Sequence, residues 1–166
     1  MRHQTMCIWL LGLAMLGAVM AAPMPKYRIT VKADKHTDFR ALRTYAWTNG
    51  WVAFDRVLDR HIVAAIDAEL ASLGLTKRMA EPCDVVVTYG ALRRTDVDVH
   101  ADRPHHSGTY PEYPVATLVV LMMQPGTRRE LFRARVDVPV DTDTAHLEQQ
   151  IDTIVAQMFA DYPTRQ

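Results

Sequence analysis

The chain has 166 residues, of which 49% are hydrophobic and 23% are charged. Its 19 basic and 19 acidic residues cancel to a formal net charge of zero, and the two signs are interspersed. Such a sequence has no electrostatic footprint for nucleic acid or for an anionic membrane surface. Its length suffices for one domain with a proper hydrophobic core.

The N-terminus has the pattern of a secretory signal peptide over residues 1–21. Arg2 opens the segment and is followed by the apolar run "CIWLLGLAMLGAVM". Val19 and Ala21 supply the small side chains that a cleavage site requires. The apolar stretch through Ala22 is shorter than the ~20 residues needed to cross a bilayer. We expect cleavage after Ala21; cleavage after Ala22 and retention as an uncleaved anchor are the alternatives.

Cleavage after Ala21 would leave residues 22–166, with a formal net charge of −1 because the removed segment carries one arginine and no carboxylate. Cys83 would be the only cysteine left, which excludes an intramolecular disulfide. Cys7 lies at the front of the apolar run, so it does not match the lipid-accepting cysteine of a lipoprotein signal. We therefore expect a periplasmic or secreted protein with no lipid anchor and no membrane span after cleavage.

Two extended segments open the expected domain. "KYRITVKAD", residues 26–34, alternates apolar and polar side chains with the period of a half-buried strand. "LRTYAW", residues 42–47, contains strand-favouring residue types. Tyr45 and Trp47 share one face of this segment, either as core or as a platform that stacks a ligand. We expect core, because each buried ring removes ~150–250 Å² from water.

The clearest helix is "FDRVLDRHIVAAIDAELASLGL", residues 54–75. Its apolar stripe has a period near 3.6 and consists of Leu58, Ile62, Ile66, Leu70 and Leu73. Asp55 is the expected N-cap, and Gly74 is the expected left-handed residue that ends the helix. The charged residues off the stripe are interpreted as a solvated face: Asp59, Arg60, Asp67 and Glu69.

Three further strands and a second helix complete the chain. "CDVVVTYGALRRTDVDV", residues 83–99, predicts a long strand that projects beyond the core. "VATLVVLMM" and "ELFRARVDV" flank Pro125-Gly126, whose residues fit a type II turn, and predict an antiparallel hairpin. The second helix ends before Pro163. Its apolar stripe is Leu147, Ile151, Ile154, Val155 and Met158.

This order of strand, strand, helix, three strands and helix predicts an α+β fold. Two amphipathic helices with one apolar stripe each can cover one face of a sheet. We therefore expect a two-layer sandwich in which two helices pack on an antiparallel sheet of about five strands. Residues 22–166 would form this single domain, with a Pro/His-rich loop at about 100–114.

The same segments resemble the bacterial family called domain of unknown function 4136 (DUF4136). The resemblance begins at "DFRALRTYAW", continues through "LASLGL" and "CDVVVTYG", and includes the hairpin "TLVVLMMQPGTRRELFRARV" and the end "MFADYP". It implies an envelope location and an α+β fold, and it supplies no catalytic or binding residues. Two departures are the absence of a lipid-accepting cysteine and the presence of Phe132 where the family often has Trp.

The strongest candidate for chemistry is the segment "DVDVHADRPHHSGTYPEYP", residues 96–114. It gathers the potential metal ligands His100, Asp102, His105 and His106 within seven residues. Imidazole and carboxylate groups suit Zn, Cu or Ni. The alternative is a polar loop with solvated histidines, since the spacing matches no known metal signature. Tyr110 and Tyr113 in the same loop are equally suited to a protein contact.

Other reactive residues favour a structural interpretation. We expect Cys83 to be a small buried thiol; the alternative is a catalytic thiol activated by His61 or His100. Ser72 lies on the first helix, and Ser107 is not in a nucleophile elbow.

Charged clusters also have structural interpretations. The carboxylate pairs, which we assign to an outward strand face and a helix start, are Asp96/Asp98 and Asp141/Asp143. The last hairpin carries a local basic face made of Arg128, Arg129, Arg133 and Arg135. Glu130 and Asp137 dilute this face, so we interpret it as a solvated strand edge, with an anion or partner site as the alternative.

Two functional hypotheses follow from the sequence. The first is a non-enzymatic envelope module that binds or assembles with an envelope partner, and its oligomeric state is left open. The second is a periplasmic protein that binds a divalent metal through residues 100–106. We favour a binding protein over an enzyme, with no required cofactor, because the sequence contains no assembled catalytic set.

Overall fold

The computed structural model describes residues 28–50, 55–98, 110–139 and 144–165. The expected signal peptide, residues 1–21, lies outside the described residues. In chain order the elements are β1 (Arg28–Ala33), β2 (Thr44–Trp47), α1 (Arg56–Ser72), β3 (Thr76–Arg78), β4 (Val85–Val97), β5 (Glu112–Met123), β6 (Glu130–Pro139) and α2 (Thr144–Met158).

The described strands form one mixed sheet in the order β1-β6-β5-β4-β2-β3. The pairs β1·β6, β6·β5 and β5·β4 are antiparallel, whereas β2 runs parallel to both β3 and β4. The α+β class is confirmed, but the expectation of about five antiparallel strands is wrong. The short strand β3 has three exposed residues and no apolar alternation, so the sequence pattern did not predict it. The parallel pairing arises because α1 is the crossover connection that brings the chain back in the same direction.

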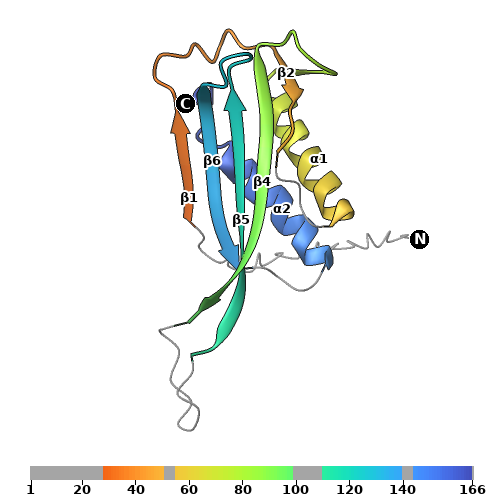
Figure 1. Cartoon of the computed structure of the whole chain (residues 1–166), viewed down its shortest axis with the longest axis vertical. Coiled ribbons are helices and arrows are strands. Elements are labelled where there is room, and N and C mark those ends of the chain that lie inside the picture. Colours follow the sequence, from red (N-terminus) through yellow and green to blue (C-terminus); the bar gives the residue numbers. More distant parts are fainter. Residues whose placement is uncertain (1–27, 51–54, 99–109, 140–143, 166) are drawn as a thin grey trace, which may run out of the picture.

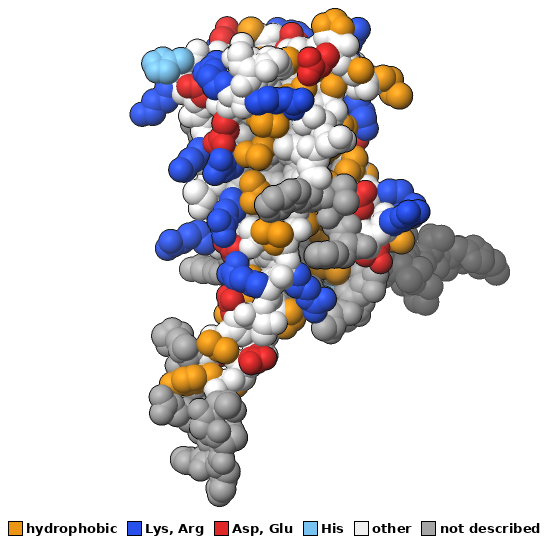
Figure 2. Space-filling view, viewed as in Figure 1, with side chains coloured by type: hydrophobic (Ala, Val, Ile, Leu, Met, Phe, Trp, Pro, Cys, Tyr) orange, Lys and Arg blue, Asp and Glu red, His pale blue; other side chains and the backbone are white. Residues whose placement is uncertain are grey.

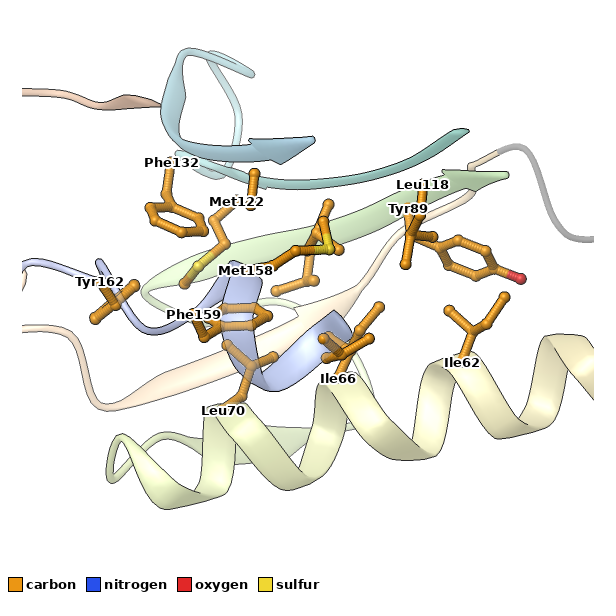
Figure 3. Close-up of a cluster of buried hydrophobic side chains, with 14 of the residues drawn as sticks. Ile62, Ile66, Leu70, Tyr89, Leu118, Met122, Phe132, Met158, Phe159 and Tyr162 are labelled. Atoms are coloured by element: carbon orange, nitrogen blue, oxygen red, sulfur yellow. The ribbon is translucent and has the colours of Figure 1, made fainter. Parts of the chain in front are cut away.

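Both helices lie on the same side of the sheet, behind it in Figure 1, and they contact each other. The core fills the space between the helices and this inner face of the sheet (Figure 3). From α1 it receives Ile62, Ile66 and Leu70, which are at most 4% exposed. The two-layer arrangement therefore follows from one apolar stripe on each helix.

Both predicted ends of α1 are confirmed. The Asp55 carboxylate accepts hydrogen bonds from the backbone N–H groups of Val57 and Leu58, as an N-cap does. At the other end Gly74 has a φ of +85°, and the N–H of Leu75 donates to the carbonyl of Leu70. This is a Schellman ending, which requires a left-handed residue at that position.

The rings of the second strand are part of the core, as predicted. Tyr45 is 2% exposed, and Trp47 is half-buried against the core. The Tyr45 hydroxyl and the Trp47 indole N–H both donate to the Asp67 carboxylate on α1, at 2.6 and 2.8 Å. The two rings are therefore held against a helix instead of lining an open platform.

Strands β4 and β5 extend beyond the rest of the sheet, as the sequence predicted for β4 (Figure 1). The β5·β6 register begins at Val115, and β2 pairs only with Val85–Val87 of β4. From Thr95 and Pro114 outward, the described sheet consists of two paired strands, ending at Val97 and Glu112. We call Thr95–Val97 and Glu112–Pro114 the ribbon.

No helix among the described residues has the length and apolarity needed to span a membrane.

Candidate functional site

A cavity of about 240 Å³ lies between the sheet and the first turns of the two helices. Its lining comes from both layers: Asp55, Leu58 and Ile62 near the start of α1; Leu147, Gln150, Ile151 and Ile154 on α2; and Ala91, Leu92, Arg93, Ala116, Thr117, Leu118, Val136 and Val138 on the sheet. Most of these side chains are apolar. The cavity is therefore suited to an apolar group.

Two inward-facing positions of the sheet that border the cavity carry only a methyl group. On β4 the core-facing positions run from Val87 and Tyr89 to Ala91. On β5 they run from Met122 to Ala116 at the same end. Both alanines line the cavity. The short side chains at these two positions leave part of the space between the sheet and the helices unfilled.

Most polar side chains that line the cavity already form hydrogen bonds with other groups of the protein. The carboxylate of Asp55 caps α1, and these backbone hydrogen bonds lower its pKa. The Thr117 hydroxyl donates to Asp137 on the other face of the sheet. The Gln150 amide donates to the Pro139 carbonyl at 3.5 Å.

Arg93 is different from these groups. It lines the cavity, is exposed, and lies directly opposite Ala116 in the β4·β5 register. No hydrogen bond or salt bridge joins its guanidinium to another residue within the described ranges. It therefore supplies a positive charge at the rim of an apolar cavity.

The ribbon exposes apolar side chains. Val97 is 50% exposed and Tyr113 is 37% exposed, although both are types that usually avoid full solvation. They belong to neighbouring strands, with Tyr113 opposite Asp96 and Val97 opposite Glu112. Strand alternation therefore directs the two side chains to opposite faces of the ribbon.

The face of the sheet without helices carries a second exposed feature. Val119, Leu121 and Met123 alternate with core-facing residues of β5 and are partly exposed. Figure 2 shows this face, with hydrophobic side chains down its middle and Lys and Arg gathered along the side of β1 and β6. Each guanidinium of the predicted basic face has a partner: Arg128 with Thr48, Arg129 with Asp34, Arg133 with Glu130, and Arg135 with Asp137. Three of these four arginines therefore pair with a carboxylate, which offsets their positive charge.

The expected solvated face of α1 is wrong for three carboxylates. Asp67 accepts hydrogen bonds from the two β2 rings and from the Lys77 ammonium at 2.7 Å. Asp59 accepts one from the Tyr89 hydroxyl, and Glu69 one from Arg165. Buried Tyr and Trp need polar partners, so the rings themselves were a signal that nearby acceptors would be used. Desolvation and the hydrogen bond to Asp67 raise the pKa of Tyr45 well above its usual value.

The predicted metal ligands lie outside the described residues: His100, Asp102, His105 and His106. Within the described ranges, no group of three or more His, Cys, Asp or Glu side chains could hold a metal ion. Metal binding at residues 100–106 stays a prediction. Titration of Zn and Cu against the protein and against the double variant His105→Ala, His106→Ala decides it, because equal heats would remove the site.

Cys83 has the environment of a structural thiol, although it is half-buried instead of fully buried. Its Sγ donates to the Val85 carbonyl at 3.2 Å. Partial burial and the nearby Glu81 carboxylate raise the pKa of the thiol, which opposes the thiolate that nucleophilic chemistry needs. His61 is engaged elsewhere, with Nε2 at 3.0 Å from Asp152.

The remaining reactive residues are also structural where they are described. Ser72 donates to the Glu69 carbonyl at 2.7 Å. Asp96 pairs with Arg94 at 2.9 Å, which lowers its pKa and keeps it ionised. The pair Asp141/Asp143 and Ser107 lie outside the described residues.

The chain belongs to the DUF4136 family, a domain of unknown function whose model matches residues 29–164. No curated protein matches its sequence. The resemblance first suggested by the strand and helix motifs is therefore confirmed over nearly all of the expected domain.

Solved structures share the fold at low sequence identity. A DUF4136 family protein from Bacteroides thetaiotaomicron aligns with a TM-score of 0.61 and 11% identity over 86% of this chain and 98% of its own. A PDZ domain protein from Parabacteroides distasonis gives 0.57 and 17% over 82% of this chain. This chain spans 35% of that protein's length. The PelC dodecamer from Paraburkholderia phytofirmans gives 0.55 and 9% over 81% of this chain and 95% of its own.

Proposed function

We propose that this protein is an exported, non-enzymatic module of the bacterial cell envelope that binds a partner protein through its ribbon. The observation that carries the proposal is the extension of β4 and β5 past their neighbours, with Val97 and Tyr113 exposed on it. The predicted signal peptide supports export to the periplasm or beyond the cell. The partly exposed apolar strip on β5 lies on the same face of the sheet as Tyr113 and supports a contact surface there.

The ribbon has strand edges that are available to pair with another chain. A two-stranded ribbon alone is marginally stable in water. Within the described chain, the outer edges of Thr95–Val97 and Glu112–Pro114 pair with no third strand. Free edges of this kind readily pair with another chain. A partner that adds a strand or covers Val97 and Tyr113 would stabilise the ribbon and gain affinity from it.

The partner is either another envelope protein or a second copy of this chain. PelC, whose fold is similar, was solved as a dodecamer. At 9% identity this likeness shows only the fold. Self-association is therefore one of the outcomes that the experiment must separate.

Site-specific photo-cross-linking tests the proposal. A benzophenone amino acid is placed at Val97 or Tyr113 of the full-length protein expressed in its native bacterium, and at Met79 as a matched control. Met79 is 99% exposed and lies far from the ribbon, in the β3–β4 connection. We expect adducts of one defined mass from the ribbon positions and none from Met79. Adducts with equal yield from all three positions, or none from the ribbon, would contradict the proposal.

The location of the protein is tested separately. Cell fractionation followed by N-terminal sequencing of the isolated protein is expected to find a chain that starts at Ala22 in the soluble envelope fraction. A chain that starts at Pro23 would move the cleavage site to the alternative position. An intact Met1 in the membrane fraction would show an uncleaved anchor, and recovery from the cytoplasm would contradict the envelope role.

A further inference from the structure

We propose that the cavity between the helices and the sheet binds the apolar chain of an anionic amphiphile, with Arg93 at the rim binding its head group. The inference concerns a small-molecule site on the inner face of the sheet. It does not rest on the ribbon or on a protein partner. The two proposals can therefore fail separately.

The size of the cavity limits the ligand. An engineered apolar cavity of ~150 Å³ holds one benzene molecule. In the same proportion, 240 Å³ accommodates roughly ten carbon atoms. That volume suits one medium-length acyl chain and excludes a sterol or a two-chain lipid within the cavity.

The lining determines the chemistry of the tail. Leu58, Leu147 and Ile151 approach from the two helices, and Ala91 and Ala116 form part of the sheet wall. These side chains offer dispersion contacts and no hydrogen-bonding group. An aliphatic chain therefore fits, whereas a sugar or a nucleotide would bury polar groups without partners.

The rim determines the chemistry of the head group. Arg93 is the cation among the lining residues, and its guanidinium has no described partner. A guanidinium binds a carboxylate or a phosphate through two parallel hydrogen bonds. The other charged lining residue, Asp55, is already occupied by the backbone N–H groups of Val57 and Leu58. Among the described lining residues, Arg93 is therefore the one positive group available to bind an anion.

Calorimetric titration with saturated fatty acids of six to sixteen carbons tests the tail. Each methylene buried in the cavity should strengthen binding about fourfold. We expect this gain to continue to roughly ten carbons and then to level off, because further methylenes remain in water. A gain that continues unchanged to sixteen carbons would indicate surface adsorption or micelle formation and would overturn the site.

Two variants locate the binding and separate tail from head. Ala116→Leu fills the cavity and should abolish decanoate binding. Arg93→Gln should weaken decanoate about tenfold or more and leave 1-decanol unchanged. Lys32→Gln removes an exposed charge from β1 and is the matched control, with no expected effect on either probe. If Ala116→Leu fails to fold by circular dichroism, Ala91→Val narrows the same cavity and replaces it.

Three outcomes of these titrations would contradict the proposal. Absence of binding by both decanoate and 1-decanol would show that the cavity is closed to ligands. Decanoate binding that survives both Ala116→Leu and Ala91→Val would place the probe elsewhere. An equal loss of decanoate affinity in Arg93→Gln and Lys32→Gln would reduce the head-group contact to nonspecific charge. Decyl phosphate and decanoate, whose tails have matching lengths, distinguish a phosphate from a carboxylate head.

Discussion

The two ends of the core are built differently. At the end near the β5–β6 turn, Phe132 stacks on Phe159 with ring centroids 5.5 Å apart, and Tyr162 meets Phe132 edge-on at 5.2 Å. At the other end, where the helices begin, Ala91 and Ala116 border the cavity. Figure 3 shows the rings and methionines between the layers, together with Ile62 and Leu118, which line the cavity. One end is closed by aromatic side chains, and the other contains the cavity.

On the outer face of the sheet, polar contacts connect the strands beside the cavity. Next to the cavity, Arg94 contacts Asp96 at 2.9 Å and Asp137 at 3.0 Å, and the Thr117 hydroxyl donates to Asp137. The open end is thus held by polar contacts on the outside of the sheet, and the packed end is held by buried rings. The aromatic packing and the cavity thus lie at opposite ends of one core.

Truncation of a ring at the packed end should have the largest effect. Phe159 is fully buried, so Phe159→Ala is expected to lower the free energy of unfolding by about 3–5 kcal/mol. Leu147→Ala at the open end should cost only about 1 kcal/mol, because Leu147 is half-buried and already borders the cavity. Urea unfolding followed by circular dichroism compares them. Equal losses would show that the two ends are packed alike.

Enlarging an alanine should separate the two ends next. Ala134 is fully buried on β6 among filled positions, so Ala134→Leu should destabilise the protein by about 1–3 kcal/mol through overpacking. Ala116→Leu has room in the cavity and should cost less than about 0.5 kcal/mol or stabilise the protein. A larger loss for Ala116→Leu than for Ala134→Leu, measured by the same unfolding method, would mean that the cavity is filled.

Acid should lower the free energy of unfolding through Asp137, which lies next to the cavity. Partial desolvation opposes ionisation of Asp137, but hydrogen bonds from Thr117, Arg135 and Arg94 outweigh it and lower its pKa from 3.8 to about 2. Because the folded-state pKa lies below the unfolded value, the stabilisation is complete above about pH 4 and is lost as the pH falls toward 2. Asp137→Asn should therefore reduce the dependence of unfolding free energy on pH between 4 and 2. Unchanged dependence would remove this role.

A small effect is expected from removal of a hydroxyl at the packed end. The Tyr162 hydroxyl is buried, burial raises its pKa, and it has no hydrogen-bond partner among the described residues. Tyr162→Phe removes the desolvation cost of this group and should leave stability unchanged or raise it by up to about 1 kcal/mol. A clear loss in thermal unfolding would show that the hydroxyl is satisfied in solution.

The sequence predicted those features that depend on local pattern. The stripe and both ends of α1, the β5–β6 hairpin and the projection of β4 all follow from the periodicity and the cap residues of single segments. The parallel pairing of β2 with β4 could not be predicted in this way. It depends on a crossover through α1 and on Asp84, whose carboxylate accepts hydrogen bonds from the backbone of Arg43 and Thr44.

The candidate sites were predicted less well than the fold. Exposure on the ribbon follows from the length of β4, and Tyr113 was already a candidate for a protein contact. The cavity depends on Ala91 and Ala116, which are 25 positions apart in the sequence and lie diagonally across the β4·β5 pairing, beneath two helices. An alanine in a strand carries no signal by itself. The space arises only when the register and the helix positions are fixed.

Xenon binding tests the difference between the two ends most directly. An apolar cavity that stays dry takes up xenon under pressure, whereas a close-packed core does not. In crystals of the protein kept under xenon, we expect one strong site bordered by Ala91, Ala116 and Ile151. Xenon among Phe132, Phe159 and Tyr162, or no xenon in the cavity at all, would contradict the account.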